Sequence, residues 1–183
     1  MSTRRNYLKI LVSGPYASGK TTFVKTVATS SLLTTEVPVS TLYESQVKQY
    51  TTIAFDYGKT NVDGVDVYLF GTPGQTRLQF MWRVLSAGMH GYIFIVDGTS
   101  MLHVLRSRAV YEYMKSLGDY PHVVAVSKQD LPNSVKPSIV AQLFGISPGS
   151  VMPLVTHDRS SALTVLKRIV EIVRESTDQP FFK

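Results

Sequence analysis

The sequence contains no cysteine among its 183 residues. A disulfide scaffold, a thiolate zinc site, an iron–sulfur cluster and a cysteine nucleophile are therefore excluded. Charged side chains are also scarce, at 17% of residues, whereas 44% of residues are hydrophobic. This balance excludes a disordered chain and a highly charged coiled coil, and a chain of this length can bury a core of its own.

Long apolar runs are lacking as well. No stretch approaches the ~20 residues that a membrane-spanning helix needs. The apolar run after the basic start is too short for a signal peptide, Ser2 stands where myristoylation needs glycine, and the C-terminal end has no cysteine for prenylation. We therefore expect a cytoplasmic protein with no transmembrane segment and no lipid anchor.

Negative charge is the scarcer sign, with 13 Asp and Glu against 19 Lys and Arg and a formal net charge of +6. Such an excess could serve to bind nucleic acid or an anionic membrane. However, the basic residues are scattered and form no block longer than a pair such as Arg4–Arg5. A mildly basic surface is the favoured interpretation, and nucleic acid is not expected as a partner.

Short β-branched apolar runs alternate with longer amphipathic segments along the chain. The last amphipathic segment has clear helical spacing, and Asp63-Gly64 supplies the tight turn of one hairpin. The alternation predicts an α/β fold, a three-layer P-loop G domain over residues 1–183, with a mostly parallel six-stranded sheet and one antiparallel hairpin strand. The expected strands are 7–13, 52–59, 65–70, 92–96, 122–126 and 151–155, and the expected helices are 20–30, 76–87, 102–117, 137–144 and 160–174.

A phosphate-binding motif follows the first expected strand. The segment GPYASGKT fits G-x-x-x-x-G-K-[ST] between a strand and a helix, so its backbone N–H groups would surround phosphates. Lys20 would bridge β- and γ-phosphate oxygens, and the Thr21 hydroxyl would bind Mg²⁺. The motif alone does not separate GTPases from ATPases or kinases. The residues expected at the phosphates are Gly14, Tyr16, Ala17, Ser18, Gly19, Lys20, Thr21 and Thr22.

Three further loops narrow the class. FGTPGQ (70–75) follows the third expected strand, SKQD (127–130) follows the fifth, and TTIAF (51–55) opens the second. With these loops the sequence resembles the Ras-like small GTPases from Tyr7 to Arg174. It is most similar to their prokaryotic Arf-like branch, the conservon-type and gliding-motility-type small G proteins. Residues 51–58, 69–75 and 80–82 carry this finer likeness.

The resemblance implies a guanine-nucleotide switch with slow, Mg²⁺-dependent GTP hydrolysis, in which Lys20 and Gln75 are the catalytic residues. Gln75 would orient the attacking water, and Gly74 would donate its N–H to the γ-phosphate. Thr52 would reach Mg²⁺ in the triphosphate state, within a first switch over about residues 41–57. At the base, the resemblance assigns recognition of guanine to Asp130, Lys128, Thr156 and His157.

Several positions depart from the family pattern. Gly71 stands where an aspartate usually holds Mg²⁺, and we hypothesise that Asp56 on the neighbouring strand compensates. Tyr16 occupies a loop position that is often glycine, and its ring would crowd Gln75 and slow hydrolysis. Ser127 replaces an asparagine, which predicts the loss of one tie between the base loop and the phosphate loop. Asp97 is expected to cap or brace the next loop rather than to act in catalysis.

The partners implied by the resemblance are an exchange or activating factor, commonly a roadblock-type protein, and an unknown effector. Three alternatives stay open. A nucleotide-binding scaffold with little or no hydrolysis is favoured by Gly71 and Tyr16. A P-loop kinase would need an arginine-rich lid, and the sequence shows no such cluster. Binding of ATP in place of GTP rests on Ser127.

Overall fold

The computed structural model describes residues 7–30, 35–38 and 52–178. Its strands are β1 (Tyr7–Ser13), β2 (Thr35–Pro38), β3 (Thr52–Val62), β4 (Val65–Gly71), β5 (Gly91–Asp97), β6 (His122–Ser127) and β7 (Val151–Pro153). Its α-helices are α1 (Lys20–Val27), α2 (Gln79–Ser86), α3 (Met101–Ser116), α4 (Pro137–Phe144) and α5 (Arg159–Asp178), and the short 3-10 turns η1 (Thr76–Leu78) and η2 (Pro148–Ser150) complete the set.

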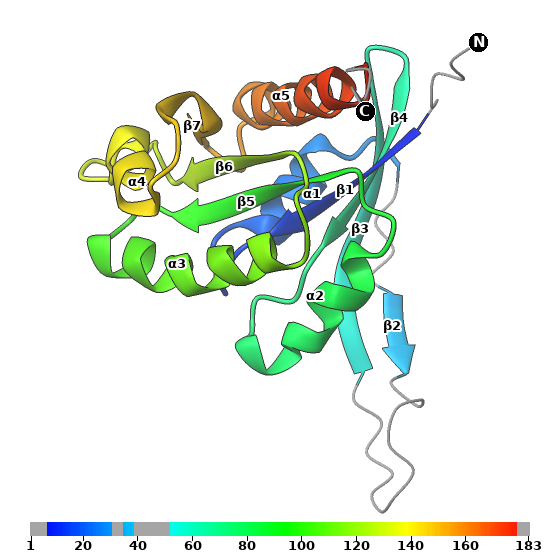
Figure 1. The fold of residues 1–183 in the computed structure, drawn as a ribbon, viewed down its shortest axis with the longest axis horizontal. Helices are drawn as coiled ribbons and strands as arrows, with labels where there is room; N and C mark the ends of the chain where they lie inside the picture. The colour runs from blue at the N-terminus through cyan, green and yellow to red at the C-terminus, as the bar shows by residue number, and fades with distance from the viewer. Residues whose placement is uncertain (1–6, 31–34, 39–51, 179–183) are drawn as a thin grey trace, which may run out of the picture.

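A single sheet holds the described strands together, and helices lie on both of its faces (Figure 1). The strand order is β2-β3-β4-β1-β5-β6-β7. Only β3 runs against its neighbours, since β2–β3 and β3–β4 are antiparallel pairs and the other pairs are parallel. In such a sheet the carboxyl ends of the parallel strands share one edge, where ligands bind.

The core has two parts, one on each face of the sheet. On one face, α1 and α5 contribute Phe23 and Leu166 to a cluster with residues of β1 and β4. On the other face, α2, α3 and α4 contribute Trp82, Tyr111 and Phe144 to a second cluster. Strand β5 lies between the two clusters, and all of its residues are buried, as expected for a parallel strand that is covered on both faces.

The predicted α/β architecture is confirmed, and each expected strand and helix is present near its expected position. The sheet has seven strands instead of the expected six because β2 adds to the outer edge of β3. The predicted hairpin turn is also confirmed. Asp63 and Gly64 both have positive φ, at 49° and 81°, as a tight two-residue turn requires.

Helices α1 and α2 are shorter than predicted, whereas α5 extends beyond its predicted end to Asp178. Helix α1 ends at Val27, because the N–H groups of Thr29 and Ser30 bond to the carbonyl of Lys59 on β3 and pull the chain away from the helix axis. The predicted helix 76–87 begins as the 3-10 turn η1, and α2 itself starts only at Gln79. Helix α2 is consequently short, with eight residues.

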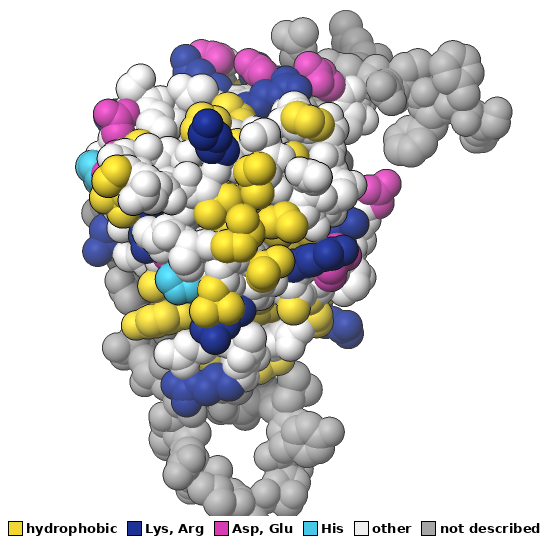
Figure 2. Space-filling model, turned by 90° about the vertical axis from the view of Figure 1, so that its left-hand side faces the viewer, with side chains coloured by type: hydrophobic (Ala, Val, Ile, Leu, Met, Phe, Trp, Pro, Cys, Tyr) yellow, Lys and Arg dark blue, Asp and Glu magenta, His cyan; other side chains and the backbone are white. Residues whose placement is uncertain are grey.

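Apolar side chains are not confined to the interior. Figure 2 shows a patch of hydrophobic side chains bordered by basic ones on the face of the molecule where α3 and α4 lie. The exposed apolar residues of these helices are Met101, Leu102, Leu105 and Ile139. None of the helices in the described part of the chain is long and apolar enough to span a membrane.

Candidate functional site

The loop between β1 and α1 has the backbone of a phosphate-binding loop. Gly14, Ala17 and Gly19 have positive φ, at 145°, 61° and 105°. A Cβ on Gly14 would come within 2.2 Å of the carbonyl oxygen of Ile95, so this position tolerates only glycine. The positive φ angles curl the chain around a hollow, as the motif predicts.

This hollow is part of a cavity of about 450 Å³ at the carboxyl end of the sheet. Three segments far apart in the sequence line it: the phosphate loop with the start of α1, residues 55–56 of β3, and residues 71–74 after β4. The lining residues are Tyr16, Ala17, Gly19, Lys20, Thr21, Thr22, Phe55, Asp56, Gly71, Thr72, Pro73 and Gly74.

Lys20 is the buried cation of this cavity. Its side chain is almost fully buried, and its Nζ donates to the carbonyl oxygen of Pro15 at 2.6 Å. Burial lowers the pKa of Lys20 to about 8, although the negative charge of Asp56 acts in the opposite direction. A cation that has lost part of its hydration and has only a carbonyl to bind is well suited to accept a phosphate.

Gly74 lies directly against the phosphate loop. A Cβ built on Gly74 would stand 2.6 Å from the Cα of Tyr16 and 2.8 Å from the Nζ of Lys20. Only glycine therefore fits, and the chain after β4 lies next to the lysine that would hold the terminal phosphate. This is the neighbourhood that the sequence predicts for Gly74.

Asp56 occupies the space that Gly71 leaves free. The two residues face each other across β3 and β4, and a Cβ on Gly71 would stand 3.1 Å from Oδ2 of Asp56. The same Oδ2 accepts a hydrogen bond from the Thr21 hydroxyl at 2.6 Å. The carboxylate thus reaches the side chain that the motif assigns to Mg²⁺.

The donor set around Thr21 suits magnesium. A hydroxyl and a carboxylate oxygen beside a phosphate site are the oxygen ligands that Mg²⁺ takes when it also binds a nucleotide. Within the described ranges, no group of three or more histidine, aspartate or glutamate side chains is placed to hold a metal ion by itself. A metal ion would therefore also need ligands from a bound nucleotide. The side chain of Thr52, the other expected ligand, lies outside the described residues, as does most of the expected first switch.

Gln75 does not line the cavity. Its side chain is exposed, and its Oε1 accepts a hydrogen bond from Nε of Arg77 at 2.6 Å. Tyr16 lines the cavity but is 74% exposed, so its ring lies at the rim instead of filling the phosphate site. The predicted catalytic pair is therefore not assembled in this conformation, since Lys20 is inside the cavity and Gln75 is outside it.

The base loop is tied to the phosphate loop, and one expectation was wrong. The Ser127 hydroxyl lies 2.8 Å from the carbonyl oxygen of Ser18 and 3.1 Å from that of Val96. The serine therefore connects the base loop to the phosphate loop, although the replacement of asparagine by serine predicts the loss of one such connection. Thr156 makes a second connection, because a Cβ on Gly19 would stand 2.8 Å from its Cγ2. Both loops thus pack against the phosphate loop.

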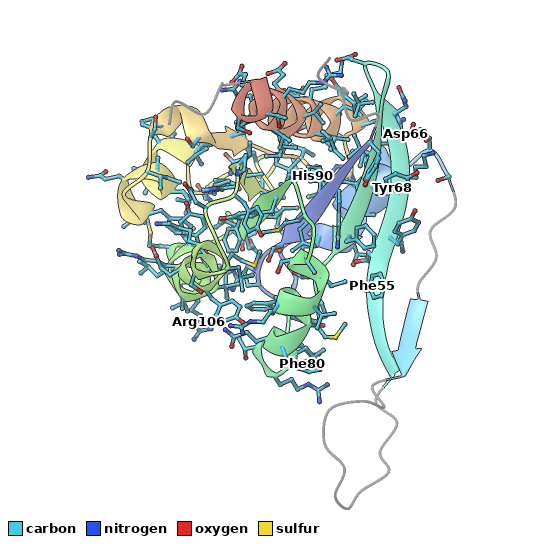
Figure 3. The ribbon with its side chains drawn as sticks, turned by 45° about the vertical axis from the view of Figure 1, so that its right-hand side comes forward. Phe55, Asp66, Tyr68, Phe80, His90 and Arg106 are labelled. Atoms are coloured by element: carbon cyan, nitrogen blue, oxygen red, sulfur yellow. The ribbon has the colours of Figure 1, made fainter. Side chains whose placement is uncertain are left out.

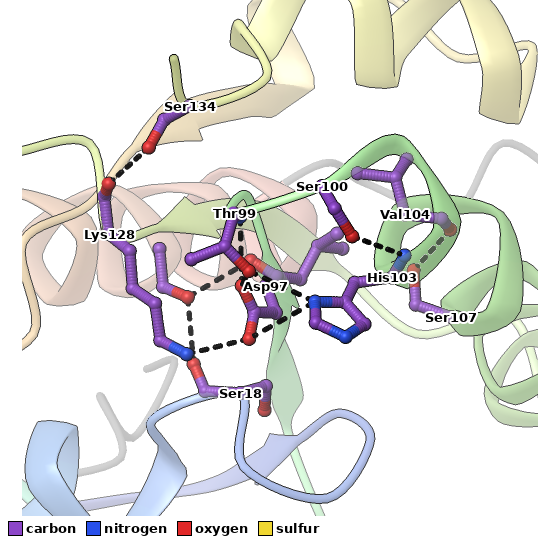
Figure 4. Close-up of polar contacts among 11 residues, drawn as sticks. Ser18, Asp97, Thr99, Ser100, His103, Val104, Ser107, Lys128 and Ser134 are labelled. Carbon is purple, nitrogen blue, oxygen red and sulfur yellow. Dashed lines mark hydrogen bonds and ion pairs between the residues drawn. The ribbon is translucent and has the colours of Figure 1, made fainter. Parts of the chain in front are cut away.

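The expected base-recognition residues lie on these neighbouring loops. Nε2 of His157 is 4.0 Å from Oδ2 of Asp130, and both side chains are at least two-fifths exposed. Nζ of Lys128 is 2.6 Å from Oδ2 of Asp97 (Figure 4). Asp97 also accepts hydrogen bonds from the backbone N–H and hydroxyl of Thr99, as expected for a loop cap.

Sequence reasoning missed three features of this site. It did not assign Phe55 to the cavity wall, although the residue precedes Asp56. It did not pair Lys128 with Asp97, and a signal was available, because Asp97 ends one parallel strand in register with Ser127, which ends the adjacent strand and precedes Lys128. It also did not foresee the contact between Gln75 and Arg77, for which the sequence offers only a spacing of two residues.

The chain matches one family model and several known proteins in sequence. The model of a family described as "Conserved hypothetical ATP binding protein" matches residues 29–182. The chain is also similar to the proteins named "ADP-ribosylation factor-related protein 1" of Bos taurus, Rattus norvegicus and Mus musculus, with 28% identity over 127 residues in each. These matches include 67% of this chain and only 59% of each relative's length. The findings support a small-GTPase-like P-loop fold.

Proposed function

Since this chain belongs to the P-loop family described as conserved hypothetical ATP binding proteins, we propose that it binds a nucleoside triphosphate with Mg²⁺ and acts as a guanine-nucleotide switch. The close approach of Gly74 to Lys20 carries this proposal. A terminal phosphate that binds Lys20 must contact Gly74 or displace it. Either way, the segment after β4 differs between the triphosphate and diphosphate states, which is what a switch requires.

Magnesium would be held by the Thr21 hydroxyl, with Asp56 as the supporting carboxylate and Thr52 as the ligand that depends on nucleotide state. When bound, the ion neutralises charge that develops on the phosphate oxygens. The hydrogen bond between Thr21 and Asp56 supports these assignments, because it brings the two oxygens within 2.6 Å of each other, and both residues line the cavity. The remaining phosphate contacts would come from the loop backbone and Lys20.

Guanine would be recognised through Asp130, whose carboxylate can accept from the N1–H and the 2-amino group of guanine, neither of which adenine has. The backbone N–H groups of Thr156 and His157 would face the guanine O6. The description of the family favours a second candidate, in which the bound nucleotide is ATP. The two candidates differ in base preference and share the same phosphate site.

Hydrolysis would be slow. Gln75 must leave Arg77 and turn into the cavity before it can orient a water molecule toward the γ-phosphate. The alternative is a nucleotide-binding scaffold without hydrolysis, in which Gln75 stays outside. We further propose that the chain belongs to the prokaryotic Arf-like branch, that it is located in the cytoplasm and that a roadblock-type protein regulates it.

The output of the switch would be binding of a partner protein, and the surface beside α2 supports this. On β4 every second residue is buried, whereas Tyr68 and Phe70 are only partly covered. Their rings lie near those of Tyr57 and Phe55, with centroids 5.1 to 6.5 Å apart, and Figure 3 labels Phe55 and Tyr68 at this edge of the sheet. This aromatic face adjoins the nucleotide site, because Phe55 precedes Asp56 and Phe70 precedes Gly71.

The chemistry of the aromatic face indicates the kind of partner. Tyr7, Lys9, Tyr68 and Phe70 line a groove of about 330 Å³, and Nζ of Lys9 lies 5.0 Å from the centre of the Phe70 ring. No described carboxylate forms an ion pair with Lys9. We expect a partner segment that places apolar side chains on the rings and a carboxylate at Lys9.

Phosphate release from GTP and from ATP under single-turnover conditions tests the proposed activity. We expect slow release from GTP, little from ATP, and a clear loss in Gln75→Leu but not in Gln142→Leu, which alters an exposed glutamine of α4. Tight GTP binding with no phosphate release would support the scaffold instead. Release that is faster from ATP would establish the second candidate.

A further inference from the structure

Asp97 is a buried carboxylate between Lys128 of the base loop, the turn at Thr99 and the start of α3. It ends β5, is 6% exposed, and lies in register with Ser127 of β6. Its Oδ1 accepts from the N–H of Thr99 at 2.9 Å and from the Thr99 hydroxyl at 2.6 Å. Its Oδ2 accepts from Nζ of Lys128 at 2.6 Å. Both oxygens are thus committed (Figure 4).

The pairing keeps Asp97 charged despite its burial. Burial acts to raise the pKa of Asp97, but the hydrogen bonds from Lys128 and Thr99 outweigh it, and the pKa lies below its ordinary value. His103 approaches from α3, with Nδ1 3.0 Å from the Thr99 hydroxyl and 3.7 Å from Oδ2 of Asp97. Lys128 makes the shortest of these approaches to Oδ2.

Lys128 is held at both ends. Its backbone has a φ of 62°, a conformation that a residue with a side chain adopts only when its surroundings impose it. The Ser134 hydroxyl and the N–H of Leu131 both donate to its carbonyl oxygen and fix that backbone. Asp97 fixes the ammonium group at the other end. The alkyl stem between them is therefore held at both ends.

We propose that Asp97 is a positioning residue of the base site, which holds the ammonium group of Lys128 so that the lysine stem forms a fixed apolar wall for a purine ring. The inference rests on the proposed function, because it assumes that the base lies at Lys128. A stem that is held before the ligand arrives does not lose its rotational freedom when the base stacks on it. Without Asp97 the ammonium group would be free to turn into solvent.

The two contacts of Asp97 allow its positioning role to be separated from its role as a loop cap. Lys128→Met keeps a long apolar stem and removes the ammonium group. Thr99→Val removes a hydroxyl donor to Asp97 and leaves the ion pair with Lys128 intact. If Asp97 acts through Lys128, only the first of these changes reproduces the effect of Asp97→Asn.

The test is a double-mutant cycle on the affinities of GDP and inosine diphosphate, which lacks the exocyclic amine. We expect Asp97→Asn and Lys128→Met each to lower the affinity for both nucleotides about tenfold. The affinity of the double variant should be no lower than that of either single variant, as for residues that act as one unit. The ratio between the two affinities should stay at its wild-type value, because the carboxylate of Asp130 is untouched. Thr99→Val and the remote Asp66→Asn, which alters a carboxylate paired with Lys59, should bind like wild type.

Three outcomes overturn the inference: an unchanged affinity in Asp97→Asn, effects that multiply in the double variant, or a loss in Thr99→Val as large as that in Asp97→Asn. If Asp97→Asn does not fold, the difference in nucleotide affinity between Lys128→Met and Thr99→Val tests the inference instead. A wild-type preference for ADP would refute the guanine proposal, and the same cycle measured with ADP would still test Asp97. A protein that binds neither nucleotide refutes both.

Discussion

The hydroxyl of Thr21 donates a hydrogen bond to Oδ2 of Asp56 at 2.6 Å, although the two residues are 35 positions apart in the chain. The contact joins the start of α1 to the middle strand of the β2–β3–β4 edge. It places a carboxylate beside the phosphate loop in a chain that has glycine at position 71, where the resemblance predicts an aspartate. Gly71 and Asp56 are partners in the strand register, so the two positions share one space.

Asp56→Asn is expected to weaken the Mg²⁺ dependence of nucleotide binding. The amide keeps the shape of the side chain but loses the charge that would support the ion, and the loss of such a partner typically costs about 10–100-fold in affinity. Titration of nucleotide affinity against Mg²⁺ measures the effect. Asp63→Asn, in the exposed hairpin turn, is the matched control. A Mg²⁺ dependence that survives Asp56→Asn contradicts the assignment.

Exchanging the residues at positions 56 and 71 tests whether Asp56 takes the place of the missing aspartate. Gly71→Asp alone should lower both stability and Mg²⁺ affinity, because its Cβ would stand 3.0 Å from the Cβ of Asp56 and bring two carboxylates together. Adding Asp56→Gly should restore much of both. If Gly71→Asp alone binds Mg²⁺ more tightly than wild type, Asp56 does not fill the place of the missing aspartate.

The protein is expected to take up a proton when it binds a nucleotide in mildly alkaline solution. The pKa of Lys20 lies at about 8 in the folded chain, whereas the ordinary value for lysine is 10.5. Between these two pH values, Lys20 of the unfolded chain carries a proton that Lys20 of the folded chain lacks. The stability of the nucleotide-free protein should therefore rise with pH through this window. Phosphates favour the charged lysine, so nucleotide affinity should fall through the same window.

Calorimetry at about pH 9, in two buffers that differ in ionisation enthalpy, measures this proton uptake. We expect uptake in wild type and in Lys25→Met, which changes an exposed lysine on the same helix, but not in Lys20→Met. Equal uptake in wild type and Lys20→Met would mean that another group is responsible.

Ser127→Ala is expected to loosen the connection between the base loop and the phosphate loop. The change leaves the carbonyl oxygen of Ser18 without its hydroxyl donor and should cost about 1 kcal/mol in the free energy of unfolding. Nucleotide affinity should fall as well, because the two loops are no longer held together. Ser116→Ala, on the exposed end of α3, is the control. A variant as stable and as tight as wild type would show that the tie is dispensable.

Tyr16→Gly is expected to speed single-turnover hydrolysis. Tyr16 lies at the rim of the cavity, and Gly74, which precedes Gln75, packs against its backbone. Removing the ring gives Gln75 room to approach the γ-phosphate. Tyr16→Phe, which keeps the ring, should hydrolyse at the wild-type rate. A slower Tyr16→Gly would show that the ring assists catalysis.

The parts of the fold that sequence reasoning predicted are those set by local pattern. Helix α4 occupies its predicted range, because Pro137 can only begin a helix and Gly145, with a φ of 66°, ends it. The phosphate loop follows from its motif for the same reason, since its glycines impose the curl. In contrast, β2 is a four-residue edge strand that ends in proline, and such a segment carries no alternating pattern.

The parts of the site that were not predicted depend on contacts between distant segments. Ser127 was expected to lose a tie, but its hydroxyl reaches the phosphate loop 109 positions earlier in the chain. Likewise, the spacing of the motifs cannot indicate that Gln75 bonds to Arg77 instead of facing the cavity. The hypothesis for Asp56 rests on the resemblance together with the place of this residue in the hairpin, and the structure brings Asp56 to Thr21.

The most direct test of the account is the affinity of the purified protein for GDP and for ADP, with and without Mg²⁺, after any bound nucleotide has been removed and identified. We predict that guanine nucleotide is recovered, that GDP binds more tightly than ADP, and that removal of Mg²⁺ weakens GDP binding. A preference for ADP would contradict the role of Asp130. Failure to bind either nucleotide would contradict the account of the cavity as a whole.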